Sequence, residues 1–328
     1  MWDDNESNPY SRKPHVDKDN PYHRLAPNAF LKNQQGNNFN QSTPITQIHK
    51  NSPKKETKPM TTYIPDAEEK EFLENYKPKD YPSIGLTADI VALTIRNGEF
   101  SVLLIKRGDH PFKGRWALPG GFVNPDETSE EAATRELIEE TGIDLDRAHL
   151  EQLKTYSVPN RDPRTRVVST AYLALIPNLP NPEAGDDAAE AHFFAVKDVL
   201  ADEDSEDKIH LAFDHEQIIR DGVERAASKL EYTPLATTFL EEPFTLSDVR
   251  RVYETVWNTK LHAANFRRKV LSTQGFVTLQ GEKGVSQFDT GRVADLYKRG
   301  EAELLHPAIL RKGVDGRLHD EDVEEGGL

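Results

Sequence analysis

Three glutamates lie at helical spacing near the middle of this 328-residue chain. Glu136, Glu139 and Glu140 occupy positions i, i+3 and i+4, so a helix would place their carboxylates on one face. Like charges at these spacings lower the stability of a helix. A bound divalent cation would offset that repulsion, because hard cations take carboxylate and phosphate oxygens as ligands. The spacing therefore predicts a Mg²⁺ (or Mn²⁺) site that faces a phosphate group.

The neighbouring residues predict how such a helix would begin and end. Thr128 and Glu131 have the spacing of a capping box, and Gly142 follows the last glutamate, where helices commonly end in a left-handed residue. Gly120 and Gly121 precede the helix, where the backbone can turn sharply or approach a ligand closely. The predicted order is strand, glycine turn, loop and acidic helix.

The whole segment 121–143 resembles the Nudix box. Gly121 is followed after five residues by Glu127, and after seven more by the run RELIEETGI, which begins at Arg135. Every defined position of the box is matched, so the signal is specific. The resemblance implies an α/β/α sandwich in which the box forms loop–helix–loop. It also implies hydrolysis of a nucleoside diphosphate linked to another group.

The same resemblance implies roles for the residues of the box. Glu136, Glu139 and Glu140 would hold the metals and, with Arg135, are the catalytic candidates. Glu127 and Arg135 would brace the loop against the helix. The metals would neutralise charge on the pyrophosphate and lower the pKa of a bound water, which attacks one phosphorus in line.

The attacking water also needs a general base. A box glutamate is one candidate, and the polar loop GDDAAEA, which precedes the last predicted strand, offers Asp187 and Glu190. A polar loop that only faces water explains the same residues equally well.

Substrate contacts are expected on both sides of the box. Pro159 falls sixteen residues after Ile143, which is similar to the ADP-ribose pyrophosphatase branch of the family. Arginine suits phosphate and ribose oxygens, and an aromatic ring can stack on adenine. A place in the core is the alternative role for Trp116. The candidate substrate-binding residues are Arg107, Phe112, Arg115, Trp116, Gly120, Gly121, Arg161 and Arg164.

A second module after the box has the order helix, turn, helix, β-hairpin. Thr245 and Asp248 give the first helix, 246–257, a capping-box-like start, and the second helix covers 262–274. GFVTL and VSQF predict the two strands of the hairpin. This order is that of a winged helix-turn-helix.

The second helix and the hairpin carry side chains that suit DNA. In a helix-turn-helix the second helix enters the major groove, where arginine pairs with guanine, and basic hairpin residues contact phosphate. The alternative is that these basic side chains only keep a small domain soluble, which would give the same net charge. The segments FTLSDVRRVYETVW, NFRRKVL and DTGRVADLYKR are together similar to the C-terminal winged helix of NrtR-type regulators. The DNA-binding candidates are Asn265, Arg267, Arg268, Lys269, Lys283 and Arg292.

The predicted fold class is α+β, a Nudix sandwich followed by a winged helix. Strands are expected at 86–95 and 100–107, joined by an Asn-Gly turn, and again at LEQLKTYSV, TRVVSTAYLALI and HFFAV. The expected organisation is a disordered tail (1–62), the Nudix domain (63–204), a linker helix (205–242), the winged helix (243–312) and an acidic disordered tail (313–328).

Charge divides the chain in the same way. Residues 61–244 carry 37 acidic and 19 basic side chains, whereas 245–312 carry 7 and 12, which indicates two modules with different partners. The chain has no cysteine, so a disulfide framework is excluded, and no apolar run approaches the length that crosses a membrane. We expect a cytoplasmic protein, and the resemblance implies a homodimer.

Two functions follow. The leading hypothesis is a metal-dependent Nudix hydrolase that cleaves ADP-ribose or a related nucleoside diphosphate derivative and also binds DNA. The alternative is an NrtR-type regulator of NAD metabolism, in which the Nudix domain senses ADP-ribose and the winged helix binds operator DNA. Many regulators of this group carry a degraded box, and the intact box of this chain favours hydrolysis. A winged helix that only mediates protein contacts is a third, weaker reading.

Overall fold

The computed structural model describes residues 64–145, 148–177, 182, 188–202, 204, 205, 208–288 and 293–311. The chain divides into two compact units, 1–76 and 77–328. Helix α1 (Ala67–Asn75) belongs to the first unit, begins at the N-cap Asp66 and buries none of its side chains. The tails expected at 1–62 and 313–328 lie outside the described residues.

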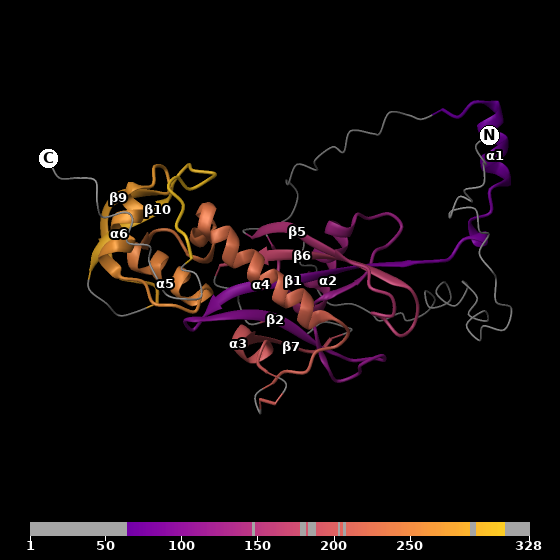
Figure 1. Ribbon diagram of the computed structural model, residues 1–328, viewed down its shortest axis with the longest axis horizontal. Coiled ribbons are helices and arrows are strands. Elements are labelled where there is room, and N and C mark those ends of the chain that lie inside the picture. Colours follow the sequence, from indigo (N-terminus) through magenta and orange to yellow (C-terminus); the bar gives the residue numbers. More distant parts are fainter. Residues whose placement is uncertain are drawn as a thin grey trace, which may run out of the picture. The chain divides into compact units, whose positions relative to one another are not determined.

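A seven-stranded sheet forms the first half of the second unit (Figure 1). Five strands run in the order β3-β2-β1-β6-β5, with β4 paired to β1 and β7 paired to β2. Asn97 and Gly98 join β1 to β2 with positive φ angles of 51° and 77°, as the Asn-Gly turn predicted. The strands are β1 (Gly85–Arg96), β2 (Glu99–Arg107), β3 (Trp116–Ala117), β4 (Gly120–Phe122), β5 (His149–Tyr156), β6 (Val167–Leu175) and β7 (Ala188–Ala195).

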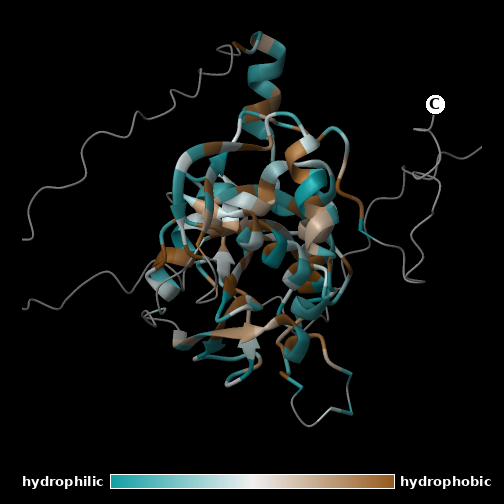
Figure 2. Cartoon of the chain, turned by 90° about the vertical axis from the view of Figure 1, so that its left-hand side faces the viewer, coloured by the Kyte–Doolittle hydropathy of each residue, from teal (hydrophilic) through white to brown (hydrophobic). Residues whose placement is uncertain are grey.

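Helices cover both faces of this sheet, which confirms the predicted sandwich. Because side chains alternate along a strand, Ile90 of β1 packs under α2 (Ser129–Thr141), whereas Val91 packs under α4 (His215–Tyr232). Gly222 lets α4 approach closely, since a Cβ there would lie 3.0 Å from Cγ1 of Val91. The described helices mix teal and brown residues in Figure 2, as amphipathic helices do. Two short helices flank this region, η3 (Pro78–Asp80) and α3 (Val196–Val199).

Helix α2 begins and ends as its sequence predicts. The reciprocal capping box of Thr128 and Glu131 is present, and Gly142 adopts the left-handed conformation with φ of 69°. Leu137 is fully buried against the sheet, whereas its neighbour Ile138 is 42% exposed. Both caps therefore fix the helix that carries the three glutamates.

We expect Gly142→Ala to lower the free energy of unfolding by about 1 kcal/mol, because a Cβ is disfavoured in the left-handed region. Urea unfolding followed by circular dichroism measures the change. Gly142→Asn should recover part of the loss, since asparagine visits this region more readily. Equal stability of the alanine variant and the wild type would contradict the assigned cap.

The winged helix confirms the predicted second module. Its elements are η4 (Pro234–Phe239), β8 (Phe244–Thr245), α5 (Leu246–Val256), α6 (Ala263–Ser272), β9 (Val277–Gly284) and β10 (Ala294–Arg299). The three strands pair in the order β8-β10-β9. Thr245 and Asp248 form the capping box of α5. Residues of α5 and of the Nudix sheet belong to one continuous apolar cluster, in which Val249 and Val91 are both fully buried.

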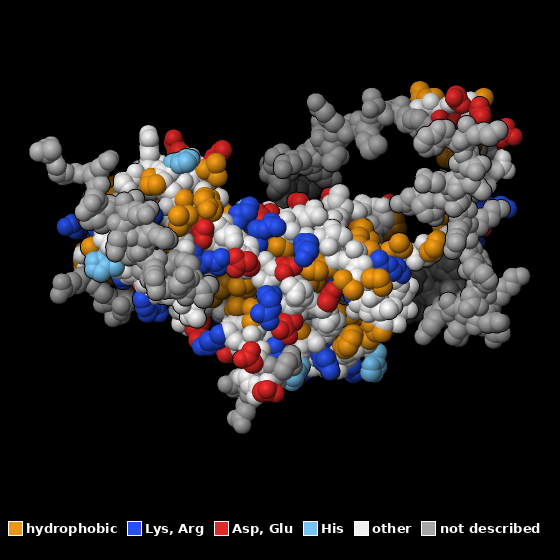
Figure 3. Space-filling model, viewed as in Figure 1, with side chains coloured by type: hydrophobic (Ala, Val, Ile, Leu, Met, Phe, Trp, Pro, Cys, Tyr) orange, Lys and Arg blue, Asp and Glu red, His pale blue; other side chains and the backbone are white. Residues whose placement is uncertain are grey.

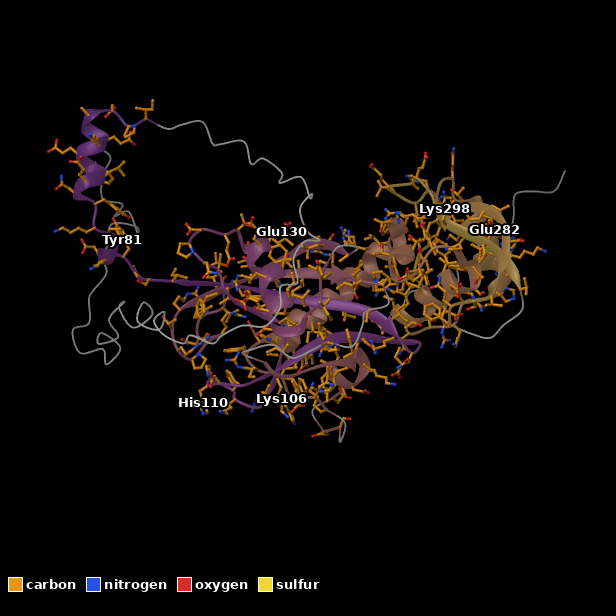
Figure 4. The ribbon with its side chains drawn as sticks, turned by 180° about the vertical axis from the view of Figure 1, so that it is seen from behind. Tyr81, Lys106, His110, Glu130, Glu282 and Lys298 are labelled. Carbon is orange, nitrogen blue, oxygen red and sulfur yellow. The ribbon has the colours of Figure 1, made fainter. Side chains whose placement is uncertain are left out.

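The predicted partner strand of the hairpin was wrong. VSQF (285–288) is not a strand, and β9 pairs with β10 instead. The reason lies at the start of α5, where a carboxylate oxygen of Asp248 accepts hydrogen bonds from Ser286 Oγ and, at 2.9 Å, from the backbone N–H of Gln287. These contacts tie the segment to the helix cap and remove it from the sheet. Glu282 and Lys298 mark β9 and β10 in Figure 4.

Candidate functional site

The loop of the box is braced against α2 by Glu127 and Arg135. The guanidinium donates from Nε and Nη2 to the two carboxylate oxygens of Glu127 at 3.0 and 2.7 Å. The backbone N–H of Asn124 donates to the same carboxylate at 2.8 Å. The hydrogen bonds from Arg135, followed by that from Asn124, lower the pKa of Glu127 to about 2. The bracing role expected for this pair is therefore confirmed by its geometry.

We expect Glu127→Gln to reduce stability at neutral pH and to lose this effect in acid. A carboxyl group with a lowered native pKa stabilises the fold above its ordinary pKa of 4.5, and the contribution disappears as the pH falls towards about 2. Urea midpoints of wild type and variant, measured from pH 7 downwards, should converge in this window. Glu130→Gln is the control, because Glu130 is exposed in the first turn of α2, three residues further on (Figure 4). A difference that does not depend on pH would contradict the brace.

The three predicted ligands of α2 differ in their surroundings. Glu140 is only 8% exposed and accepts a hydrogen bond of 2.9 Å from the backbone N–H of Gly120. Burial raises the pKa of Glu140 to about 8, although the Gly120 hydrogen bond opposes the shift. Burial also raises the pKa of Glu136. The side chain of Glu139 is 58% exposed.

The two glycines before the box allow the carboxylates and the strands to meet. A Cβ at Gly121 would overlap the carboxylate of Glu136, and a Cβ at Gly120 would overlap the carbonyl oxygen of Ala88. The close neighbours are β1 at Gly120 and the box glutamate Glu136 at Gly121. Their predicted contact with substrate stays a prediction.

The chemistry of the glutamates fits a divalent cation. As the side chains stand, no three or more His, Asp or Glu residues in the described ranges are grouped to bind a metal ion. Two of the three glutamates pair with Arg135, whose Nη1 lies 2.9 Å from Glu136 Oε1 and 2.9 Å from Glu139 Oε2. Glu139 is exposed enough to turn from Arg135, and a cation would compensate the buried charges of Glu136 and Glu140.

Two of the predicted substrate arginines lie beside the box. Burial and the charge of Arg164 lower the pKa of Arg107, while Glu140 and Asp162 oppose the shift, so these side chains interact. Arg164 pairs with both carboxylate oxygens of Asp162 at 3.1 and 2.7 Å, and its guanidinium lies 5.5 Å from the ring centre of Phe122 in β4. Arg107 and Arg164 therefore lie beside the acidic residues of the box.

Arg161 lies behind this site rather than at its surface. Its side chain is 5% exposed and donates to the carboxylate of Asp214 at 2.9 and 2.6 Å. A second carboxylate, that of Asp89 in β1, lies 3.8 Å away. Both carboxylates that face the Arg161 guanidinium belong to the protein itself. Its role towards substrate stays a prediction that these contacts do not favour.

Trp116 and Glu190 are not brought to the box. Alternation along β7 puts Glu190 on the sheet face of Phe194, opposite the face that packs under α2. Glu190 pairs there with Lys106 at 2.9 Å, which lowers its pKa, and Trp116 packs on Phe194 with ring centres 4.6 Å apart. Asp187, the other candidate base, lies outside the described residues. Figure 4 shows the position of Lys106.

Aromatic rings meet near Arg107, on a small apolar cluster of their own. Phe112 packs edge-on against Phe213 with ring centres 4.8 Å apart, and Arg107 lies 5.0 Å from the Phe213 ring. Arg115 lies 5.6 Å from the Phe112 ring. The two phenylalanines have positive φ angles of 61° and 52°, which is a strained conformation for bulky residues.

Sequence reasoning missed the buried polar residues beneath the box. Asp89 is 5% exposed and accepts a hydrogen bond from Ser169, while His215 is 4% exposed. A single acid within the apolar run LTADIVALTI was the available signal for Asp89, since an unpaired charge is costly to bury. His215 carried no comparable signal.

The winged helix presents most of the predicted DNA contacts on one helix. Asn265, Arg267 and Arg268 of α6 are exposed, whereas Phe266 and Val270 point into the core. Arg267 lies 3.9 Å from Asp295 of β10. Lys269 is half-buried and Lys283 is exposed on β9. Arg292 lies outside the described residues.

Comparison with known proteins identifies both modules. The NUDIX domain model matches residues 85–214, and the NrtR DNA-binding winged helix domain model matches residues 236–298. Nudix hydrolases generally use a divalent metal. No helix among the described residues has the length and apolar character to span a bilayer.

Two curated relatives are similar to this chain. One is the ADPR responsive transcriptional repressor NtrR of Acinetobacter baylyi, 32% identical over 241 residues that cover 73% of this chain and 91% of the relative. The other is an ADP-ribose pyrophosphatase of Methanocaldococcus jannaschii, 47% identical over 120 residues that cover 37% of this chain and 64% of the relative. The chain thus spans about two thirds of the pyrophosphatase and nearly all of the repressor.

Solved structures agree with these relatives. NrtR of Shewanella oneidensis complexed with a 27mer DNA is 31% identical, with a TM-score of 0.53 over 65% of this chain and 93% of that chain. A MutT/nudix family protein of Enterococcus faecalis is 30% identical, with a TM-score of 0.58 over 72% of this chain and 94% of that chain. The chain belongs to the NrtR family, in which a Nudix domain is followed by a winged helix domain.

Proposed function

We propose that this protein cleaves the pyrophosphate of ADP-ribose or a related nucleoside diphosphate derivative. The three carboxylates of α2 carry the proposal, with Glu136 and Glu140 against the Gly120–Gly121 turn. Arg107 and Arg164 lie beside them. The pyrophosphatase relative, 47% identical across this region, supports the substrate class. The intact set of acidic residues favours hydrolysis over a domain that only binds its ligand.

The residues of the chain have separate tasks in this proposal. Glu136, Glu139 and Glu140 would hold Mg²⁺ or Mn²⁺, which when bound supplies positive charge at the scissile phosphate. Arg107 and Arg164 would bind the diphosphate oxygens, and the brace of Glu127 and Arg135 would fix the loop. Of the two sources of the general base, we favour a box glutamate, because Glu190 is paired with Lys106 on the other sheet face.

Incubation of the pure protein with ADP-ribose and Mg²⁺ tests the proposal. We expect AMP and ribose 5-phosphate as products, identified by chromatography and mass spectrometry. A panel of other nucleoside diphosphate derivatives would define the substrate class. Absence of turnover across the panel, with Mg²⁺ and with Mn²⁺, would refute the hydrolase.

We also propose that the winged helix binds operator DNA and that ADP-ribose controls the binding. Exposed Arg267 and Arg268 on α6, and the coverage of 91% of the Acinetobacter repressor, support this second function. A homodimer in the cytoplasm would suit a two-fold operator. Fluorescence anisotropy with DNA from upstream of the gene, at several salt concentrations and with and without ADP-ribose, tests it. Binding that does not distinguish upstream DNA from unrelated DNA would refute it.

A further inference from the structure

The first turn of α4 is bonded directly to the backbone beside the box. Nδ1 of His215 accepts a hydrogen bond of 2.9 Å from the backbone N–H of Leu118. Two residues later, the backbone N–H of Gly120 donates to Oε2 of Glu140 at 2.9 Å. The segment 118–120 is therefore held between the last turn of α2, which carries the predicted ligands, and the first turn of α4.

A buried ion pair makes a second connection at the same end of α4. Asp214 occupies the N-cap position, yet its side chain caps no backbone N–H and instead binds Arg161 through both oxygens. Arg161 belongs to the loop between β5 and β6, and its neighbour Asp89 lies in β1 beside Gly120. Phe213, the next residue back, holds a positive φ of 52° and touches the ring of Phe112. Strain that surrounding contacts enforce is typical of positions that respond to a ligand.

The other end of α4 is bonded to the winged helix. The hydroxyl of Tyr253 donates to the carbonyl oxygen of Leu230 at 2.9 Å, and Nε1 of Trp257 donates to that of Ala227 at 3.0 Å. Tyr253 is fully buried in α5, and its ring centre lies 5.4 Å from that of Phe266 in α6. One 18-residue helix therefore connects the box to the helix that carries Arg267 and Arg268.

We propose that α4 couples the two sites as a rigid rod. A nucleoside diphosphate at the box changes the contacts of Glu140 and Gly120, and His215 and the Asp214–Arg161 pair pass that change to the start of α4. The helix moves as one body because its backbone is hydrogen-bonded throughout, and Tyr253 and Trp257 carry the movement to α6. His215, Asp214, Tyr253 and Trp257 are positioning residues that touch neither ligand.

This inference rests on the proposed function, because it requires both ligands to bind. Coupling between two sites is reciprocal, so operator DNA must change the affinity for the nucleotide by the same factor as the nucleotide changes the affinity for DNA. The surface of α4 carries interspersed acidic and basic side chains in the space-filling view (Figure 3), several of them paired with β5. Those surface pairs supply matched controls that leave the connections at the two ends intact.

The test removes the two polar donors at the winged-helix end. In the double variant Tyr253→Phe and Trp257→Phe, both hydrogen bonds to α4 are lost while an aromatic ring is kept at each position. The ligand is α,β-methylene ADP-ribose with Mg²⁺, which carries no cleavable pyrophosphate. The ratio of the DNA Kd with and without this analogue measures the coupling, and calorimetry measures the affinity for the analogue alone.

We expect a wild-type ratio between about 5 and 150, the usual range of coupling, and a ratio near one for the double variant. Affinity for the analogue without DNA should stay within about threefold of wild type, since a purely structural defect would lower it. Asp214→Asn should also reduce the ratio, from the opposite end of α4. The matched control is Asp221→Asn, on the same helix, whose carboxylate binds Lys154 and Tyr156 and does not contact the box.

Two results distinguish a failure of the coupling through α4 from a failure of the proposed function. If the analogue and DNA both bind and the full ratio survives in the double variant and in Asp214→Asn, the rod is refuted while the proposed function stands. If calorimetry detects no binding of the analogue to the wild type, the proposed function is refuted, and the inference falls with it.

Discussion

Replacement of Glu139 by Gln will lower kcat for ADP-ribose hydrolysis by at least about a hundredfold, which corresponds to about 2.7 kcal/mol of transition-state stabilisation. The substitution removes one negative charge from the three carboxylates that would hold the cation. Glu139 is the cleanest of the three to change, since it is exposed, whereas Glu140 supports Gly120 and Glu136 lies against Gly121. The glutamine oxygen can still accept the hydrogen bond from Arg135.

The control for this experiment is Glu130→Gln, which removes the same charge from the exposed face of α2 (Figure 4). Its kcat should stay close to that of the wild type. Urea unfolding of both variants separates a catalytic defect from a folding defect. A Glu139→Gln enzyme that retains the wild-type kcat at saturating Mg²⁺ would show that the box does not perform the reaction.

Replacement of Arg267 or Arg268 by Ala will weaken binding to operator DNA by about 10- to 100-fold each, equivalent to about 1–3 kcal/mol for a base contact. Both side chains are exposed on α6, and the buried Phe266 and Val270 fix which face the helix presents. A residue that reads a base should relax sequence preference at one position. A residue that contacts phosphate should weaken all sequences alike and flatten the dependence on salt.

Arg220→Ala is the matched control, because Arg220 is an exposed arginine on α4, outside the winged helix, paired with Glu216 at 3.0 Å. It should leave DNA affinity unchanged. Titrations at several salt concentrations, on operator and on scrambled DNA, separate the two kinds of contact. DNA affinity that survives both substitutions would reject α6 as the recognition helix.

Local sequence signals predicted the elements that position the site. The capping boxes at Thr128 and Thr245, and the left-handed end of α2 at Gly142, depend on residues within four positions of each other, so their spacing is readable directly. The pairing of Glu127 with Arg135 is likewise a short-range contact across the loop and helix of the box.

Long-range contacts could not be read in this way. Arg161 looks like a substrate ligand in the loop PNRDPR, but it is neutralised by Asp214, which lies 53 positions away, and by Asp89. Glu190 looks like a base near the metal, but a strand's alternation turned it to the other sheet face, where Lys106 holds it. Asp248 diverted 285–288 from the hairpin. Each outcome was decided by a charged partner supplied through tertiary structure.

The continuous apolar cluster from β1 to α5 has a consequence for how this chain could be divided. Truncation between α4 and α5 would expose an apolar surface on each fragment. The fragments would therefore aggregate rather than behave as independent domains. Calorimetry of the intact protein should then record one melting transition for both halves. Replacing this winged helix with another DNA-binding domain would also require the apolar face of α4 that packs against α5.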